Sequence, residues 1–377
     1  MNKKIFVYSF FSGAGFLDFG FEKSGVKICF ANEIHKPFLD AYKYSRKMLG
    51  IVSPEDGFAN DDIGEYLSGK KLSFIVNAVK KKRKHGYVGF IGGPPCPDFS
   101  VGGKNKGRYG DNGRLSSTYI DLLTKAKPDF FLFENVKGLW RTKKHKQFFD
   151  EIKRRAQNSG YWTTERLINA IEYGVPQDRE RIILMGFSRN VLEDKGIKTN
   201  RSCLRELAKE MFPWEKTIVH QKEKVFDLPW PKTIKFRQEN ELAPPEGIDQ
   251  KLTVQHWFKK NKVEEHPNAR HCFRPKAGIV RFAEVPEGDD SRKSFKRLHR
   301  WRYSPTACYG NNEVHLHPYK VRRINVAEAL AIQSLPKEFL LPEDMTLTDM
   351  FKTTGNGVPY LAAKGLAKSV TIFLGEK

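Results

Sequence analysis

One cysteine stands in a sequence context where a thiol could act as a nucleophile. Cys96 lies in the run GGPPCPDFS (residues 92–100), directly after an apolar segment that ends at Ile91. Prolines before a cysteine fix the direction of its side chain, and exposed backbone amides nearby could lower the pKa of the thiol. The alternative is a small buried hydrophobic residue, the usual fate of a free cysteine. The proline-rich frame favours the nucleophile.

A carboxylate follows a second, very apolar segment. Glu134 lies in the run FLFENV (residues 131–136). Partial burial at the end of a strand would raise its pKa enough for the side chain to carry a proton. We therefore interpret Glu134 as a candidate general acid, with an ordinary strand-end carboxylate as the alternative.

A short glycine motif near the N-terminus predicts a cofactor. FSGAGF (residues 11–16) follows the first apolar run and opens a helix, where glycines let the backbone approach a ligand closely. Glu33 comes at the end of the second predicted strand, where a carboxylate can hold ribose hydroxyls. The pair predicts a nucleoside-containing cofactor, and a tight turn without a ligand is the alternative. Asp18 occupies the place of the third glycine of the dinucleotide fingerprint, which counts against NAD and leaves room for S-adenosylmethionine (SAM).

The elements that must position these residues alternate in type along the first half of the chain. Apolar runs rich in β-forming residues predict strands at 5–11, 26–31, 88–91 and 130–133, and helical patterns fall at 38–49 and 115–126. Such alternation predicts a parallel, doubly wound α/β sheet with ligands at the carboxyl ends of its strands. Two further strands, at 162–171 and 181–187, extend the sheet.

The pattern dissolves between about Ser188 and Lys320. This segment contains proline-rich stretches and scattered basic residues without sustained periodicity, which predicts a second, irregular domain. Helical periodicity returns at 326–333 and 361–372, after a loop that contains GNGVP (residues 355–359). Periodicity alone leaves open which domain the C-terminal segment joins.

Composition narrows the class of protein. The 377 residues are enough for one large or two ordinary domains, and no oligomer is needed for a stable fold. Five widely spaced cysteines without a CxxC pair argue against a zinc site or a disulfide framework. The sequence has no apolar stretch of membrane-spanning length and no signal-peptide pattern, so we expect an intracellular protein.

The net charge of +22 is typical of a protein that neutralises phosphates. Ribosomal factors and proteins of membrane surfaces are equally basic, so charge alone does not identify the partner. The basic block at 80–84 resembles a nucleic-acid patch, with a solvated loop or helix end as the alternative.

Five motifs together carry a resemblance to a known family. FSGAG, GGPPCPDFS, FENV, QDRER (residues 177–181) and GNGVP resemble the C5-cytosine-specific DNA methyltransferase family in order and in spacing, from Phe10 to the C-terminus. The resemblance implies a Rossmann-like, doubly wound SAM-dependent methyltransferase fold with a smaller target-recognition domain. It also implies DNA (cytosine-5-)-methyltransferase activity of the bacterial restriction-modification type.

By this resemblance the catalytic residues are Cys96, Glu134, Arg179 and Arg181. Cys96 would attack C6 of a cytosine that has swung out of the duplex, since the ring atoms cannot be reached within the stack. Glu134 would contact N3 and the exocyclic amine, and Arg181 would bind O2 and brace Glu134. Arg179 would hold the cysteine loop and nearby backbone, while Gln177 would shape the turn or meet the DNA.

The resemblance also implies SAM as the cofactor, S-adenosylhomocysteine as the product, and no metal. The cofactor-binding residues it implies are Phe11, Gly13, Gly15 and Leu17 around the methionine part, Glu33 at the ribose, Ile34 on the adenine face, Asp62 and Ile63 at the adenine amine, and Asn356 and Val358 at the C-terminal side, with Pro94 also in the set.

The implied domain organisation is a catalytic domain of residues 1–187 plus 323–377 and a target-recognition domain of residues 188–322. The last helix, at 361–374, would complete the large domain, and the glycine-rich cationic loop at 101–115 would close over the flipped base. Weak candidates for base contacts in the major groove are His271, Arg274, Arg297, Arg300, Arg302 and Asn311, although most basic residues there will contact phosphate or water.

Three positions depart from the family pattern. Pro97 stands where glutamine is usual, Ala327 stands where arginine usually precedes Glu328, and Gly357 replaces the commoner alanine or serine. None of these changes removes a reacting group, so they bear on loop and domain contacts and not on the reaction class.

Three other interpretations are less favoured. An RNA cytosine-5 methyltransferase of the same family would carry a Cys-Phe-Thr signature, which is absent. A non-catalytic DNA-binding homologue is disfavoured by the presence of Cys96, Glu134 and Arg181, and an NAD-dependent dehydrogenase lacks its third glycine and a hydride site. We therefore expect double-stranded DNA as the partner, no membrane, a monomer in the bacterial cytoplasm associated with the nucleoid, and a cognate restriction endonuclease as a genetic partner.

Overall fold

A computed structural model of the chain describes residues 3–95, 111–198, 205–275, 279–292, 294–309 and 313–375. Cys96, Pro97, Asn311 and most of the loop predicted to close over the base lie outside the described residues. The described residues contain no helix that is long and apolar enough to cross a membrane.

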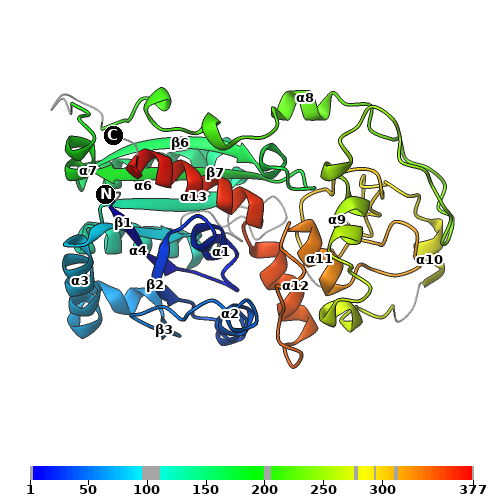
Figure 1. The fold of residues 1–377 in the computed structure, drawn as a ribbon, viewed down its shortest axis with the longest axis horizontal. Coiled ribbons are helices and arrows are strands. Elements are labelled where there is room, and N and C mark those ends of the chain that lie inside the picture. The colour runs from blue at the N-terminus through cyan, green and yellow to red at the C-terminus, as the bar shows by residue number, and fades with distance from the viewer. Residues whose placement is uncertain are drawn as a thin grey trace.

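The described strands form one seven-stranded sheet in the order β3-β2-β1-β4-β5-β7-β6 (Figure 1). Six strands point in one direction, and β7 alone is reversed, antiparallel to both of its neighbours, β5 and β6. Their bounds are β1 Lys4–Phe10, β2 Lys27–Asn32, β3 Phe58–Ala59, β4 Gly86–Gly92, β5 Phe130–Val136, β6 Tyr161–Asn169 and β7 Glu180–Ser188.

The doubly wound α/β fold is confirmed, but the sheet is mixed and not wholly parallel. Only residues 170–179 join β6 to β7, and a parallel crossover needs a dozen or more residues, usually with a helix. The reversal brings the start of β7 to the edge of the sheet where β5 ends.

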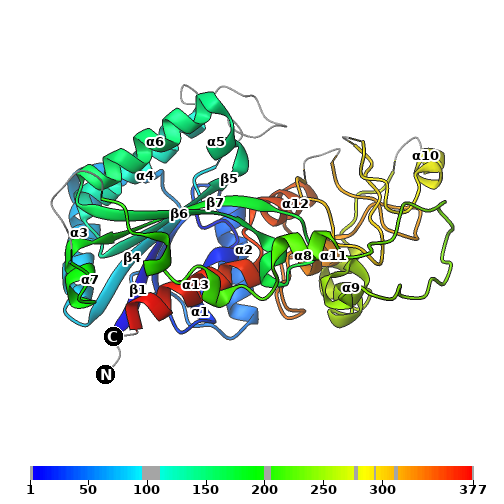
Figure 2. The same cartoon turned by 90° about the horizontal axis from the view of Figure 1, so that it is seen from above.

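Helices cover both faces of the sheet (Figure 2). On one face lie α3 (Gly69–Arg83), α4 (Asp111–Ala126), α5 (Lys137–Arg141) and α6 (Lys143–Asn158), and on the other lie α1 (Phe16–Glu22) and α13 (Tyr360–Gly375). Alternate residues of β1 point into the apolar cores on opposite faces of the sheet. Val7 packs with α1 and α13, while Tyr8 packs with α3 and α4. Buried apolar layers therefore fix the sheet between its helices.

Several expected elements have shifted or additional bounds. The predicted helix at 38–49 is α2 (Lys36–Met48), and the one expected from residue 115 begins at Asp111. The amphipathic helices α3 and α6 were not predicted. The basic block at 80–84 ends α3, where Lys82 is buried and paired with Glu55.

The C-terminal helix α13 packs on α1 and on the sheet. Gly20 of α1 approaches it so closely that a Cβ there would lie 2.5 Å from the backbone of Ala363. Glycine is therefore required for this contact. The packing agrees with the expected return of the last helix to the large domain.

After β7 the chain forms α7 (Arg189–Asp194) and a segment that still packs on the sheet through Leu207, Phe212 and Trp214. It then builds an irregular lobe, seen to the right in Figures 1 and 2. The described helices that follow are α8 (Lys222–Phe226), α9 (Val254–Lys260), α10 (Ile279–Glu284), α11 (Val326–Ile332) and α12 (Leu347–Asn356). Short 3₁₀ helices lie at Ile63–Leu67, Ala170–Tyr173, Lys209–Met211, Glu215–Thr217, Gln250–Leu252 and Pro267–Arg270. A core cluster joins α9, α11 and α12 to Phe16 and Phe19 of α1.

Buried arginines organise this lobe. The guanidinium of Arg297 donates to the backbone carbonyls of Phe282, Val285, His317 and Lys320. Such contacts satisfy polar groups where no sheet ladder does.

Arg300 is also buried, and it pairs with Glu287 and Asn240. The suggestion that Arg297 and Arg300 contact bases is therefore wrong for this conformation, because both side chains are enclosed and bonded within the protein. Arg274 is exposed and Arg302 is half-buried.

Candidate active site and cofactor pocket

A carboxylate and a guanidinium meet at the edge of the sheet where β5 ends. Nε of Arg181 donates to Oε1 of Glu134 at 2.9 Å, and both side chains are largely buried. The antiparallel pairing sets Arg181 opposite Val136, two residues beyond the glutamate. Burial raises the pKa of Glu134, while the charges of Arg181 and Arg179 act in the opposite direction. Burial outweighs the two cationic neighbours, so the site holds a carboxyl group whose pKa lies above its usual value.

The glycine-proline segment after β4 runs beside this carboxylate. A Cβ on Gly93 would lie 2.7 Å from Oε2 of Glu134, so only glycine leaves room there. Nδ2 of Asn135 donates to the carbonyl of buried Pro94 at 3.4 Å. The segment that leads to Cys96 is thus held against Glu134, although Cys96 itself lies outside the described residues.

Arg179 ties three distant segments together. Its Nη1 donates to the carbonyl of Ala307 at 2.9 Å, and its Nη2 donates to those of Gly355 at 2.8 Å and Gly357 at 3.1 Å. Burial, reinforced by the neighbouring charge of Arg181, lowers its pKa to about 9. The guanidinium holds backbone next to the site, as expected in part, and its described contacts include none with the cysteine loop.

Gln177 is fully buried and contacts the same segment around Ala307 as Arg179 does. Its Oε1 accepts from the backbone amide of Ala307 at 3.0 Å, and its Nε2 donates to Oε1 of Gln333 at 3.3 Å. Gln333 in turn donates to the carbonyl of Thr354. Gln177 therefore shapes the turn and cannot meet DNA in this conformation. Sequence reasoning missed Gln333, whose partners are far away along the chain.

A second constellation surrounds the glycine loop. The amide of Gly13 donates to Oε2 of Glu33 at 2.9 Å, and the amide of His35 donates to Oε1 at 2.8 Å. Burial raises the pKa of Glu33, and these two amides oppose that shift. Phe11, Gly13 and Gly15 all have positive φ, so the loop is tightly turned. A carboxylate is thereby fixed over a strained, glycine-lined turn.

The two glycines differ in what surrounds them. A Cβ on Gly15 would lie 2.4 Å from the ring of Tyr42, whereas one on Gly13 would meet only Oγ1 of Thr353, at 3.9 Å. Gly15 is required for packing, and Gly13 leaves open space beside the loop.

A buried polar network, not anticipated from the sequence, supports this loop. Asp18 accepts hydrogen bonds from Ser9 at 2.8 Å and from Tyr42 at 2.9 Å, and Nη2 of Arg46 donates to the carbonyl of Gly15 at 2.6 Å. Arg46 also pairs with Glu22 at 3.1 Å. Burial raises the pKa of Asp18, and Arg46 opposes that shift. The residue that replaces the third glycine is thus a structural anchor.

The remaining predicted cofactor residues fall into two groups. Ile34 is 59% exposed at the end of β2, Asn356 is exposed, and Asp62 caps a 3₁₀ helix through the amide of Gly64. Leu17, Ile63 and Val358 are packed into the cores, so their side chains back the pocket.

The chemistry of these residues fits SAM. An exposed isoleucine next to a fixed carboxylate suits an adenosine, and the space beside Gly13 allows close approach of a ligand. The buried hydroxyl of Ser12 in the same loop has no hydrogen-bond partner among the described residues, so it is free to bind a ligand. No cluster of three or more potential metal-ligating residues occurs among the described residues.

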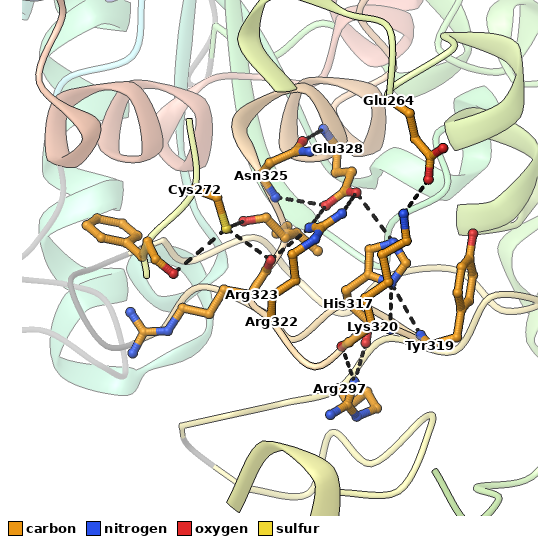
Figure 3. Close-up of polar contacts among 12 residues, drawn as sticks. Glu264, Cys272, Arg297, His317, Tyr319, Lys320, Arg322, Arg323, Asn325 and Glu328 are labelled. Atoms are coloured by element: carbon orange, nitrogen blue, oxygen red, sulfur yellow. Dashed lines mark hydrogen bonds and ion pairs between the residues drawn. The ribbon is translucent and has the colours of Figure 1, made fainter. Parts of the chain in front are cut away.

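The lobe is joined to α11 through Glu328 (Figure 3). This fully buried carboxylate accepts two hydrogen bonds from Arg322, at 2.6 and 2.8 Å, and lies 3.4 Å from Nε2 of His317. It also completes a capping box with Asn325. Arg322 thus supplies a guanidinium to Glu328 in a chain that has Ala327 at the position where the family usually has arginine.

The seven-stranded sheet with helices on both faces has the fold of a SAM-dependent methyltransferase. A DNA modification methyltransferase encoded within an E. coli prophage superposes with a TM-score of 0.64 at 21% identity, covering 99% of this chain and all of that one. The Dnmt2 methyltransferase of S. pombe superposes with a TM-score of 0.59 at 13% identity, covering 99% of this chain and 98% of that one. At these identities the likeness concerns the fold.

This chain belongs to the C-5 cytosine-specific DNA methylase family, whose model matches residues 5–371. It is 54% identical to the type II methyltransferase M.NmeDI of Neisseria meningitidis serogroup C over 374 residues, which cover 99% of this chain and 85% of the relative. It is 30% identical to the type II methyltransferase M.FnuDI of Fusobacterium nucleatum, with 96% and 94% covered. The predicted family and reaction class are therefore confirmed.

Proposed function

We propose that the chain methylates C5 of a flipped cytosine within a specific duplex DNA sequence, through a covalent adduct with Cys96. The observation that carries this proposal is the buried Arg181–Glu134 pair, which lies beside the segment leading to Cys96. Family membership supplies the reaction class, and the residue roles below extend it.

The reaction begins when the thiolate of Cys96 forms a bond to C6 of the extruded cytosine. The C5–C6 electrons move into the ring, and C5 becomes a carbon nucleophile. Glu134 contacts N3 and the exocyclic amine and stabilises the charge that develops there. SAM, when bound, supplies an electrophilic methyl group to C5. Loss of the C5 proton then restores the double bond and expels Cys96.

Arg181 and Arg179 have different tasks in this proposal. Nε of Arg181 braces Glu134, and its Nη1 donates to the carbonyl of Glu180 at 2.8 Å, which fixes the plane of the guanidinium. So oriented, Arg181 binds the cytosine O2. Arg179 is committed to four backbone carbonyls, so it acts through the framework.

The proposed cofactor site uses the loop and the strand ends described above. Glu33 holds the ribose hydroxyls, Ile34 packs on the adenine, and Asp62 reads the adenine amine, since one oxygen of its carboxylate remains available beyond the bond to Gly64. The backbone of Phe11 and Gly13 meets the methionine part. Ile63, Leu17, Val358 and Pro94 support these groups from the cores, and Asn356 closes the C-terminal side.

We assign target recognition to residues 188–322 and catalysis to residues 1–187 plus 323–377. The irregular lobe supports this division for the later part of the segment, whereas Leu207, Phe212 and Trp214 pack in the core of the sheet domain. Among the earlier base-contact candidates, Arg274 and Arg302 retain accessible side chains, and His271 is half-buried. We further propose a monomer that acts in the bacterial cytoplasm on nucleoid DNA, together with a cognate restriction endonuclease.

A trapping experiment tests the proposal. The protein is incubated with tritiated SAM and a mixed-sequence duplex that carries 5-fluorocytosine, which blocks loss of the C5 substituent, and a denaturation-resistant adduct is sought. We expect an adduct with the wild type and none with Cys96→Ser. An adduct on RNA only would favour the RNA methyltransferase interpretation, and none on either nucleic acid would overturn the proposal for the sequences offered.

A further inference from the structure

We propose that His35 and Asp349 form a clasp that positions α12 against the cofactor loop, so that SAM affinity depends on this pair of positioning residues. The inference rests on the proposed assignment of Glu33 to the cofactor.

His35 contacts both sides of the proposed pocket. Its backbone amide donates to Oε1 of Glu33 at 2.8 Å, while its ring Nε2 lies 2.9 Å from Oδ1 of Asp349 on α12. The ring also packs edge-on against Phe38, with 4.4 Å between centroids. One residue therefore links the carboxylate of the pocket to a helix 314 positions away along the chain.

The partner carboxylate is held at both of its oxygens. Asp349 lies in the first turn of α12, where Oγ1 of Thr346 caps the helix by accepting from the Asp349 amide at 3.1 Å. The same hydroxyl donates to Oδ2 of Asp349 at 2.8 Å, which leaves Oδ1 for His35. The side chain of Asp349 is only 17% exposed. Such a preset acceptor loses little conformational entropy when it binds the imidazole.

The other end of α12 is fixed by the candidate active site. Gly355, in its last turn, and Gly357, just beyond it, accept hydrogen bonds from Arg179. Between these two attachments, Oγ1 of Thr353 faces the open space beside Gly13. The ten residues of α12 span about 15 Å, and the helix lies beside α2 in both views (Figures 1 and 2). Hence α12 forms a wall of the proposed pocket. His35 attaches this wall near Glu33, and Arg179 attaches it near the candidate active site.

Several charged side chains surround the His35–Asp349 pair. The charge of Lys352 on α12 favours the ionised forms of both Glu33 and Asp349. His35 contacts the same two carboxylates. On α2, Lys36 pairs with Asp40 at 2.5 Å on the exposed side of the helix. The Lys36–Asp40 pair offers a matched control, because it lies on α2, the helix whose N-cap is His35, and has no part in the clasp.

The test is a double-mutant cycle on SAM affinity. Wild type, His35→Ala, Asp349→Ala and the double variant are titrated with SAM by calorimetry, and kcat and the KM for DNA are measured at saturating SAM. We expect each single variant to bind SAM about 5-fold more weakly, equivalent to about 1 kcal/mol, with no further loss in the double variant. We expect kcat and the KM for DNA to change less than about twofold, and Asp40→Ala to match the wild type.

A conservative variant tests whether a lower SAM affinity reflects a general loss of structure. The His35→Gln variant keeps a side-chain donor that can reach Asp349, so part of the affinity should return, and thermal unfolding without SAM should match the wild type. Unchanged affinity in both single variants, additive losses in the double variant, or an equal loss in Asp40→Ala would each overturn the clasp.

Glu33→Ala separates the clasp from the cofactor site on which it rests. If this variant abolishes SAM binding while His35→Ala does not weaken it, the cofactor site stands and the clasp fails. If the wild type does not bind SAM, both fail.

Discussion

Arg181 reaches Glu134 because β7 runs against β5. A parallel strand at this place in the sheet would bring its last residues to the edge where β5 ends, whereas the reversed strand brings its first residues, Glu180 and Arg181. The 2.9 Å contact between Nε and Oε1 therefore follows from strand direction as much as from side-chain chemistry. Two motifs that lie far apart in the sequence thereby supply the two members of one ion pair.

Removal of the Glu134 charge should stop chemistry while cofactor binding persists. We expect Glu134→Gln to lower the single-turnover rate of methyl transfer roughly 100-fold or more, because the amide cannot donate or accept a proton as the carboxyl group does. Burial raises the pKa of Glu134, so the native group can hold a proton that glutamine lacks. SAM affinity, measured by calorimetry, should stay within about twofold. A variant that transfers methyl at the wild-type rate would remove Glu134 from the mechanism.

The two loop glycines should respond differently to a methyl group. In Gly15→Ala the new Cβ would meet the ring of Tyr42 and Nη1 of Arg46, so we expect a large loss of stability in urea unfolding. In Gly13→Ala it would enter open space, at a cost of about 1 kcal/mol for the positive φ.

The same Gly13→Ala variant tests the cofactor site. Its Cβ would project into the space assigned to SAM, so affinity should fall at least about 10-fold while the fold persists. If SAM binds this variant as tightly as the wild type, the ligand does not approach the loop at Gly13.

Arg179 should matter for stability even under the mildest substitution. Arg179→Lys keeps the charge but cannot reproduce a fork that serves four carbonyls, and two of the acceptors, those of Ala307 and Gly355, are buried. We expect the free energy of unfolding to fall by about 3 kcal/mol, measured by urea denaturation at pH 7. Arg302→Lys, on a half-buried arginine of the lobe, serves as the comparison. Equal midpoints for the two variants would contradict the bracing role.

His315 should make the lobe sensitive to acid. Burial lowers its pKa from 6.5 to about 3, and its Nδ1 has no hydrogen-bond partner within the described part of the chain. The folded pKa lies below the unfolded one, so the unfolded chain binds the proton more readily and stability declines as pH falls from about 6.5 towards 3. Between pH 7 and pH 4 this group should account for about 3 kcal/mol.

A variant isolates that contribution. Phenylalanine in His315→Phe keeps a ring against Tyr309 and has nothing to protonate, so the stability of the variant should depend less steeply on pH over this range. The measurement is urea unfolding at pH 7, 5.5 and 4. Parallel pH curves for wild type and variant would show that another group carries the effect.

The strands of the sheet could be predicted well because local composition determines which segments are buried. Runs such as Phe130–Phe133 are apolar on both faces, which is typical of a central strand covered by helices on each side. The direction of β7 was missed because apolar content says nothing about orientation, although the short connection between β6 and β7 contained that information. Helices α3 and α6 were missed because many of their positions are lysine and arginine.

The candidate site was predicted where it rests on motifs and missed where it rests on distant pairing. Arg181 contacts Glu134, the pairing that the family resemblance implied, and Gly13 contacts Glu33, while the roles of all four residues stay predictions. Arg46 could not be anticipated as the support of the glycine loop, because its acceptors are 31 and 32 residues away and leave no periodic trace. The same holds for buried Arg297, which was a candidate for base contact because the family resemblance places it in the target-recognition segment.

The fork of Arg179 also sets an order of events during synthesis. Its acceptors at Ala307 and Gly357 follow it by 128 and 178 residues, so at ordinary translation rates the last one is made roughly 10 to 35 s after the arginine. Until then the guanidinium lacks its full set of carbonyls, and the wall formed by α12 does not exist. The nascent chain can thus fold its early strands on the ribosome yet remain unable to methylate DNA, and activity begins only once synthesis has passed Gly357.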